Sequence, residues 1–147
     1  MIEVKIDIQT LLKEDSSSLF CCTTNCIVTK AGKAVMGAGI ALLFKIYFPG
    51  IDENLGKKLK SDGAGVYLIW EEPAIVAFPT KYHFKDNSAI DLIIKSCHEL
   101  VNLTKDLKFD RIYLSRPGCG LGGLKWEEVG PIISEILLDD KFVIVNK

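Results

Sequence analysis

The sequence predicts an α/β protein in which helices cover both faces of a central mixed sheet of about six strands, giving three layers, α/β/α. Short apolar runs typical of buried strands alternate along the chain with segments whose apolar residues recur every three or four positions. Two glycine-rich loops each follow such a strand and precede such a helix. With 147 residues, 48% of them apolar, the chain suffices for one domain with a sizeable core, which we assign to residues 1–147.

The first half of the chain combines short strands with short helices. Apolar and charged residues alternate over residues 2–8, which is the period of a half-buried strand. Leucines at 11–12 fit a short helix, and the apolar run 19–24 predicts a second strand. Apolar residues at helical spacing over 40–47 predict a helix that ends before a Pro-Gly pair, and the pattern at 55–59 predicts another short helix.

Two strands and the clearest helix of the chain follow. The apolar runs 66–70 and 74–78 flank a turn and predict two strands. Ser88, followed three residues later by Asp91, resembles a capping box, which marks a helix start. Apolar residues then share one face over residues 90–107, which predicts a long amphipathic helix.

The end of the chain repeats the order of strand, loop, helix and strand. The run 111–115 has the composition of a buried strand, and residues 126–137 have helical spacing. Pro131 is awkward inside that helix, so we expect either a tight first turn before it or a helix start at it. Residues 142–145 predict the last strand. These elements amount to six strands and about four helices.

The glycine-rich loops predict a site for an anion. Residues 118–123 hold four glycines in six positions, and residues 30–39 hold three glycines. A loop of this kind before a helix presents free N–H groups at the positive end of the helix dipole. A tight turn without a ligand is the alternative, but such a turn requires only one or two glycines. Both loops are expected at the carboxyl edge of the sheet, where two anion-accepting loops suit a diphosphate.

Composition and charge exclude several classes of protein. A net charge of -1 argues against a general polyanion binder. Five cysteines without a CxxC pair argue against a disulfide framework and a zinc site, and for reduced thiols in the cytoplasm. The N-terminus has acids within its apolar pattern and does not read as a signal peptide. The longest uncharged stretch, residues 34–44, is too short to span a bilayer, so we expect no association with membranes. We also expect the protein to be a monomer.

Three segments resemble the macrodomain family of ADP-ribose-binding modules. Residues 35–45, VMGAGIALLFK, resemble the first loop of the family with its following helix, and residues 116–127, RPGCGLGGLKWE, resemble the second loop. Thr80-Lys81 resembles the Thr-Lys of one branch. That branch contains the terminal ADP-ribose protein glycohydrolase and the antitoxin macrodomains that remove ADP-ribose from thymidine in DNA. The resemblance covers nearly the whole chain and implies a macrodomain fold with no cofactor and no metal.

The resemblance also implies roles for single residues. Lys81 would be catalytic, Asp7 would accept a hydrogen bond from the adenine amino group, and Asn25 would face the distal ribose. Backbone N–H groups of the two loops would wrap the diphosphate and distal ribose. Their residues are Met36, Gly37, Ala38, Gly39, Ile40, Pro117, Gly118, Cys119, Gly120, Leu121, Gly122 and Gly123. The protein glycohydrolase has an aspartate where this chain has Gly122, whereas the DNA-directed antitoxins have glycine, which favours the antitoxins.

The residues alone leave other interpretations open. A lone lysine after a strand is usually a solvated surface charge, and Asn25 could simply satisfy a turn. His83 would share a face with Lys81 if the segment is extended, and Trp126 is expected to pack in the core. Cys119 reads as a small filler rather than a nucleophile.

The resemblance therefore predicts an ADP-ribosyl hydrolase that cleaves the bond at the distal ribose C1″ of a modified macromolecule. The carrier, protein or thymidine in DNA, stays open. Alternatives in the same pocket are a phosphatase of ADP-ribose 1″-phosphate, a deacetylase of O-acetyl-ADP-ribose, and a reader that binds ADP-ribose without catalysis. An ordinary mononucleotide-binding domain is a weaker alternative, because the chain has no GxxxxGK[ST] loop and no strand–GxGxxG–helix unit.

Overall fold

The computed structural model describes residues 1–147 and confirms the predicted fold class. Its six strands form one mixed sheet in the order β1-β6-β5-β2-β4-β3, in which β3 alone is antiparallel to its neighbour. The strands are β1 (Ile2–Lys5), β2 (Leu19–Thr24), β3 (Leu68–Trp70), β4 (Ala74–Pro79), β5 (Ile112–Ser115) and β6 (Phe142–Asn146). The helices are α1 (Ile8–Glu14), α2 (Gly39–Tyr47), α3 (Ile51–Asp62), α4 (Ile90–Thr104) and α5 (Trp126–Ser134).

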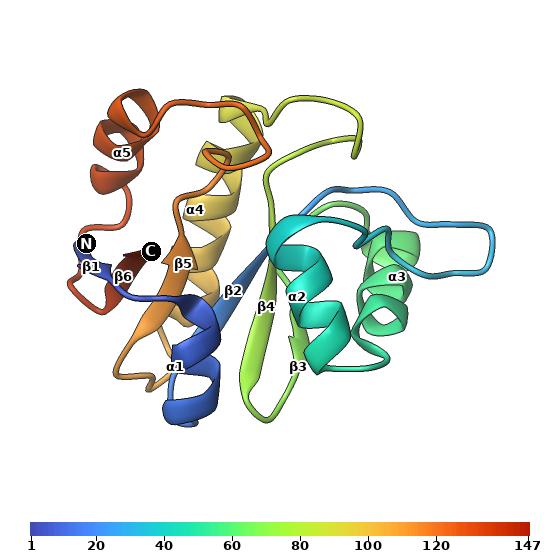
Figure 1. The fold of residues 1–147 in the computed structure, drawn as a ribbon, viewed down its shortest axis with the longest axis horizontal. Coiled ribbons are helices and arrows are strands. Elements are labelled where there is room, and N and C mark those ends of the chain that lie inside the picture. Colours follow the sequence, from blue (N-terminus) through green and yellow to red (C-terminus); the bar gives the residue numbers. More distant parts are fainter.

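Helices cover both faces of the sheet (Figure 1). The first three helices pack on one face, and α4 and α5 pack on the other. The central strand β2 is apolar on both sides, since Phe20 and Cys22 belong to the core under α1–α3 while Leu19 and Cys21 belong to the core under α4 and α5. A strand buried on both faces reads as a continuous apolar run, and this explains why its limits were predicted correctly.

The first strand is shorter than predicted because a helix begins inside its alternating pattern. Strand β1 ends at Lys5, and Asp7 is the N-cap of α1, where its Oδ1 accepts a hydrogen bond from the Gln9 N–H at 3.0 Å. An aspartate in this position satisfies one of the free N–H groups of the first helical turn. Ile8 is therefore the first residue of a helix, and the structure has five helices rather than about four.

The predicted capping box is wrong. The N-cap of α4 is Ala89, which has no side-chain cap, and Asp91 instead accepts a hydrogen bond from the Tyr82 hydroxyl. Two helices also end earlier than their apolar patterns, α4 at Thr104 and α5 at Ser134. Pro131 lies inside α5 rather than at its start, after the turn that begins at Trp126.

A glycine in α3 allows the first glycine-rich loop to pack closely against this helix. A Cβ at Gly56 would lie 2.0 Å from the Gly32 carbonyl oxygen and 3.1 Å from the Ala34 nitrogen. Gly56→Ala should therefore lower the free energy of unfolding by about 1–3 kcal/mol, although alanine favours a helix. Urea unfolding measures this change. Ser61→Ala, exposed on the same helix, is the control and should be neutral, and a stabilised Gly56→Ala variant would contradict the close packing.

No helix of the structure combines the length and the apolar character needed to cross a membrane.

Candidate active site

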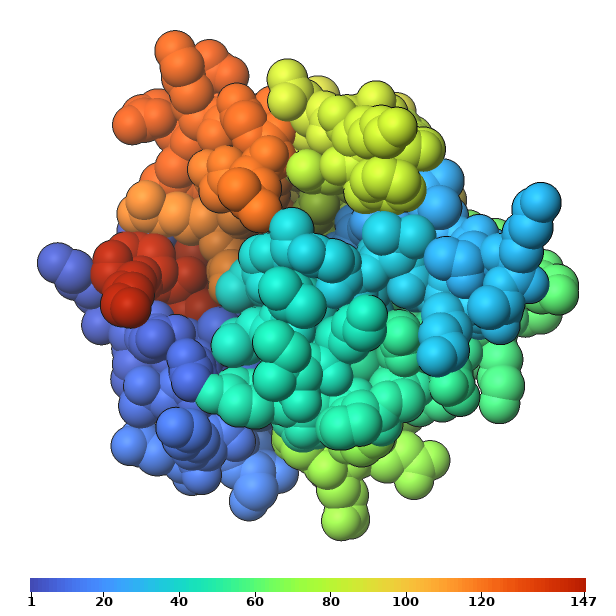
Figure 2. Space-filling model, turned by 45° about the vertical axis from the view of Figure 1, so that its right-hand side comes forward, coloured from blue at the N-terminus to red at the C-terminus, as the bar shows by residue number.

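A cavity of about 1070 Å³ opens at the carboxyl ends of the parallel strands. Three segments surround it: the loop before α2, the segment between β4 and α4, and the loop between β5 and α5. In Figure 2 these segments, coloured cyan, yellow-green and orange, converge on one face of the molecule. Both predicted loops thus lie at one edge of the sheet, in the place where ligands of open α/β sheets bind.

The first loop enters the cavity with Gly37, Ala38 and Gly39, directly before α2. Gly39 has a φ of +58°, which favours glycine, and Ala38 is an N-cap without a side-chain hydrogen bond. The N–H groups at the start of α2 are consequently available to a ligand. Asn25 supports this loop, because its amide nitrogen donates to the Val35 carbonyl at 2.9 Å.

The second loop is compact and has little room for side chains. Gly118 has a φ of +76°, and its carbonyl accepts a hydrogen bond from the Leu124 N–H at 2.9 Å. A Cβ at Gly122 would lie 2.5 Å from the Gly118 carbonyl oxygen and 2.2 Å from the Oγ of Ser88. The Ser88 N–H also donates to the Gly122 carbonyl at 2.8 Å. The second loop is therefore held against Ser88, the residue before the N-cap of α4.

Lys81 reaches across the cavity to the second loop. Its Nζ donates to the Leu121 carbonyl at 3.4 Å. The backbone beneath it is held by the end of β2, since the Thr80 N–H donates to the Thr24 carbonyl at 2.9 Å and the Lys81 N–H donates to the same oxygen at 3.4 Å. The side chain of Leu121 in turn lies against the first loop, because a Cβ at Gly39 would be 3.3 Å from its Cδ1. Lys81 is thus placed where the two loops meet.

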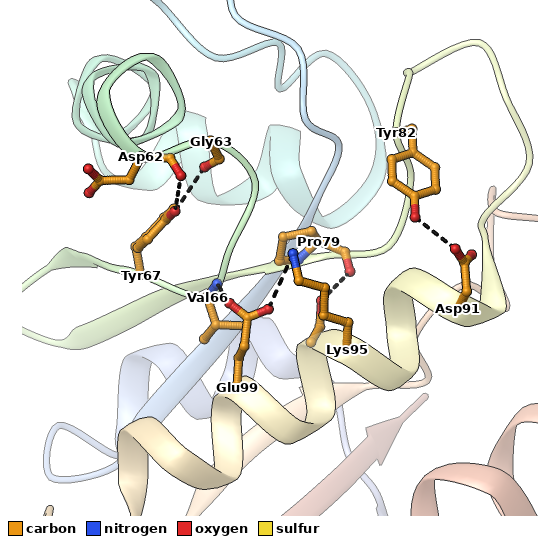
Figure 3. A network of polar contacts seen from close by, with 10 residues as sticks. Asp62, Gly63, Val66, Tyr67, Pro79, Tyr82, Asp91, Lys95 and Glu99 are labelled. Carbon is orange, nitrogen blue, oxygen red and sulfur yellow. Dashed lines mark hydrogen bonds and ion pairs between the residues drawn. The ribbon is translucent and has the colours of Figure 1, made fainter.

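Helix α4 anchors the chain on both sides of Lys81 (Figure 3). The Ser96 hydroxyl donates to the Pro79 carbonyl at 2.7 Å, and the Tyr82 hydroxyl donates to Asp91 at 2.8 Å. The hydrogen bond to Asp91 raises the pKa of Tyr82, with smaller contributions from burial and from the carboxylate charge. These contacts connect the catalytic candidate to a long helix rather than to a free loop.

The opposite end of the cavity is lined by Asp7, Val145 and Lys147. The Lys147 Nζ lies 3.9 Å from Asp7 Oδ2, while Asp7 Oδ1 already caps α1. Arg116 lines the same cavity; its Nη2 lies 2.8 Å from a Glu3 carboxylate oxygen and its guanidinium carbon lies 5.1 Å from the Trp126 ring. The hydrogen bond that Arg116 donates to the Glu3 carboxylate raises the pKa of Arg116. Trp126 is half-buried and lines the cavity as well as packing against Arg116.

Most residues that the sequence nominated line this cavity. They are Asp7, Asn25, Gly37, Ala38, Gly39, Ile40, Lys81, Gly118, Cys119, Gly120, Leu121 and Gly122. Met36, Pro117 and Gly123 do not line it. Met36 and Pro117 are buried, Met36 in the core under α1–α3, and Gly123 packs against Asn87. A motif includes the residues that shape a loop together with those that face a ligand, and spacing alone cannot separate them.

Sequence reasoning did not assign other cavity residues to the site, although Thr80, Arg116 and Glu127 lie within the motifs quoted above. They include Thr24, Thr80, Phe84, Ser88, Arg116 and Glu127. Polar residues at the ends of β2 and β4 were the available signal, because strand ends in such sheets face the ligand. His83 does not line the cavity, because its segment turns instead of staying extended and its ring packs on Phe84 with centroids 4.2 Å apart.

Neither the thiols nor a metal cluster supplies a further reactive group. Burial raises the pKa of Cys119, and the nearby Arg116 charge only partly offsets this, as Glu127 opposes it. The thiol therefore stays protonated at neutral pH and is a poor nucleophile. All five cysteines are free, and no three His, Cys, Asp or Glu side chains are grouped so as to hold a metal ion.

The chain is similar to several known proteins, although no protein-family model matches it. The ADP-ribose glycohydrolase OARD1 of Homo sapiens is 36% identical over 109 residues, 69% of this chain and 66% of that protein. The DNA ADP-ribosyl glycohydrolase of Mycobacterium tuberculosis is 30% identical over 127 residues, 81% of this chain and 34% of that protein. The chain therefore spans about two thirds of the length of the first relative and one third of the second.

Solved structures agree over the whole chain. The macrodomain of Mycobacterium tuberculosis DarG has a TM-score of 0.80 at 26% identity, covering 99% of this chain and 97% of that one. The macrodomain of Thermus aquaticus DarG has a TM-score of 0.79, also at 26% identity and with the same coverage.

Proposed function

Since this chain belongs to the macrodomain family, we propose that it is an ADP-ribosyl glycohydrolase, which binds the ADP-ribose part of a modified macromolecule and releases it by hydrolysis. One observation carries this proposal. Lys81 lies in the wall of the same cavity as both glycine-rich loops, with its Nζ 3.4 Å from the second loop. Because the N–H groups of the loops already supply donors for the diphosphate, we assign this cation to the reaction rather than to binding alone.

The residues of the cavity divide into those that bind and one that reacts. The backbone N–H groups of the two loops suit a diphosphate, and Asp7 offers a carboxylate oxygen to an amino group at the far end. Binding energy collected there would hold the C1″ atom of the distal ribose against Lys81. Water then replaces the carrier at C1″, and the carrier leaves with the proton of that water.

We further propose single-stranded DNA as the carrier. The support is the rim segment, Lys81–Lys85, in which aromatic side chains alternate with basic ones. Tyr82 and Phe84 expose 50% and 42% of their surface, and Phe84 lines the cavity. Exposed aromatic rings between cations suit stacked bases and their phosphates. The near-neutral charge of the whole protein restricts such contacts to this rim.

A panel of carriers tests both parts of the proposal. Wild-type protein would be incubated with ADP-ribosylated single-stranded DNA, ADP-ribosylated protein and ADP-ribose 1″-phosphate, and released ADP-ribose or phosphate would be measured. We expect turnover of the DNA at least about tenfold faster than of the others, because stacking of one base contributes about 1–3 kcal/mol. Equal turnover of protein and DNA would contradict the choice of carrier. Turnover of none, with ADP-ribose still bound, would identify a reader.

A further inference from the structure

Two hydroxyl groups of the protein are buried without a hydrogen-bond partner in the chain, and both belong to residues that line the cavity. They are the Oγ1 of Thr24 and the Oγ of Ser88, the only buried side-chain nitrogen or oxygen atoms of the structure in this condition. Thr24 is 5% exposed and Ser88 is 7% exposed. Burying an unpaired hydroxyl is unfavourable, so a partner is expected to come from outside the chain.

Neither hydroxyl makes a hydrogen bond that stabilises the fold. Ser88 precedes α4 but does not cap it, since the N-cap is Ala89 and no side chain bonds to the first helical turn. Thr24 contributes its backbone carbonyl, but not its hydroxyl, to the support of Thr80 and Lys81. Other buried hydroxyls are paired inside the protein; Thr104, for example, donates to the Leu100 carbonyl at 2.7 Å.

The two residues lie beside Lys81. The Thr24 carbonyl accepts hydrogen bonds from the N–H groups of Thr80 and Lys81, and the Thr80 carbonyl accepts one from Ala89, which follows Ser88. Thr24 and the segment that contains Ser88 are thus connected through Thr80, the residue that precedes Lys81. Ser88 also touches the second loop, because a Cβ at Gly122 would lie 2.2 Å from its Oγ.

From this placement we infer that Thr24 and Ser88 are binding residues for the distal ribose of the substrate. This inference rests on the proposed function, which puts the distal ribose next to Lys81. Ribose hydroxyls both donate and accept, so they can pair with a serine or threonine hydroxyl in either direction. The diphosphate needs only donors, and the N–H groups of the glycine-rich loops supply these. Because Gly122 packs over the buried Ser88 hydroxyl, this contact requires Gly122 to move, and the Lys81 to Leu121 hydrogen bond must open for Lys81 to act.

The test compares ADP-ribose with ADP, which lacks the distal ribose and ends in a free terminal phosphate. Titration calorimetry of Ser88→Ala and Thr24→Val should show ADP-ribose affinity reduced about tenfold in each, while ADP affinity changes less than about twofold. Thr24→Ser keeps the hydroxyl and should restore most of the affinity for ADP-ribose. Thr104→Val removes a buried hydroxyl far from the cavity and should leave both affinities unchanged. Thermal unfolding of every variant checks that the protein is folded.

Each outcome decides a separate point. Equal losses for ADP and ADP-ribose, or no loss for either, would overturn the assignment of the two hydroxyls while the proposed function stands. Failure of the wild-type protein to bind ADP-ribose would instead overturn the proposed function, and the inference would fall with it. A Thr24→Ser variant as weak as Thr24→Val would show that the packing of the methyl group, not the hydroxyl, matters.

Discussion

Lys81→Ala should lower turnover of an ADP-ribosylated substrate at least about 100-fold and leave the affinity for ADP-ribose within about threefold. The reason is that binding and reaction depend on different groups of the cavity. The groups proposed to bind the ligand are the backbone N–H groups of the two loops and Asp7 at the far end of the cavity. The Lys81 Nζ contacts only the Leu121 carbonyl. Removing the lysine therefore removes a group required at C1″ but few of the contacts that hold the ligand. Single-turnover kinetics and titration calorimetry separate the two effects.

The matched control is Lys85→Ala. Lys85 belongs to the same rim segment, is exposed and does not line the cavity. Its replacement should leave both turnover of a small substrate and ADP-ribose binding unchanged, because a solvated surface charge contributes little. A loss of ADP-ribose affinity in Lys81→Ala as large as its loss of turnover would contradict the separate roles.

Lys81→Arg distinguishes the two ways in which the lysine could act. A lysine that has released its proton can attack the carbonyl carbon of an opened ribose, whereas a charged lysine can polarise the bond to the carrier. Arginine keeps the positive charge but cannot act as the nucleophile. Turnover retained within about tenfold would support the electrostatic role, and turnover as low as in Lys81→Ala would support attack by the amine.

The periodic spacing of apolar residues predicted the fold. The prediction failed where a local helix cap opposed that spacing. Strand β2 was predicted with its correct limits because both of its faces are buried and every residue is apolar or small. The first strand was overestimated because the alternating pattern continues past Lys5, although Asp7 caps a helix there. Residues 6–8 could continue the alternating strand or begin a helix capped by Asp7. The helix forms, and Ile8 packs in the core under α1–α3.

The site could be predicted where backbone geometry requires a particular residue. The glycines of both loops were found because positive φ angles and close contacts exclude other residues, as at Gly39 and Gly118. Thr24 and Ser88 were not found as site residues, because a hydroxyl in the sequence does not show whether it has a partner. That property depends on how the ends of β2, β4 and the second loop pack together, and only the structure shows it.

Gly122→Ala should weaken ADP-ribose binding about 10- to 100-fold while the protein remains folded. Its Cβ would lie 2.5 Å from the Gly118 carbonyl oxygen, a backbone atom that cannot move without moving the loop. Overpacking of this kind costs about 1–3 kcal/mol, which corresponds to the expected change in affinity if the loop must be restored for binding. Titration calorimetry with ADP-ribose measures the loss, and thermal unfolding monitors the fold.

Gly120→Ala is the control within the same loop, and it separates the shape of the loop from its glycine content. A Cβ at Gly120 would meet no protein atom within 4 Å, and Gly120 does not have a positive φ. Its replacement should therefore keep the loop conformation and lower ADP-ribose affinity at least about tenfold less than Gly122→Ala does. Similar losses in both variants would mean that any methyl group on this loop blocks the ligand, and the crowding around Gly122 would not be the cause. The expected losses also differ in kind between the two parts of the site. Gly122→Ala should lose binding because the loop holds the diphosphate, whereas Lys81→Ala should keep binding and lose turnover because the lysine acts beside it.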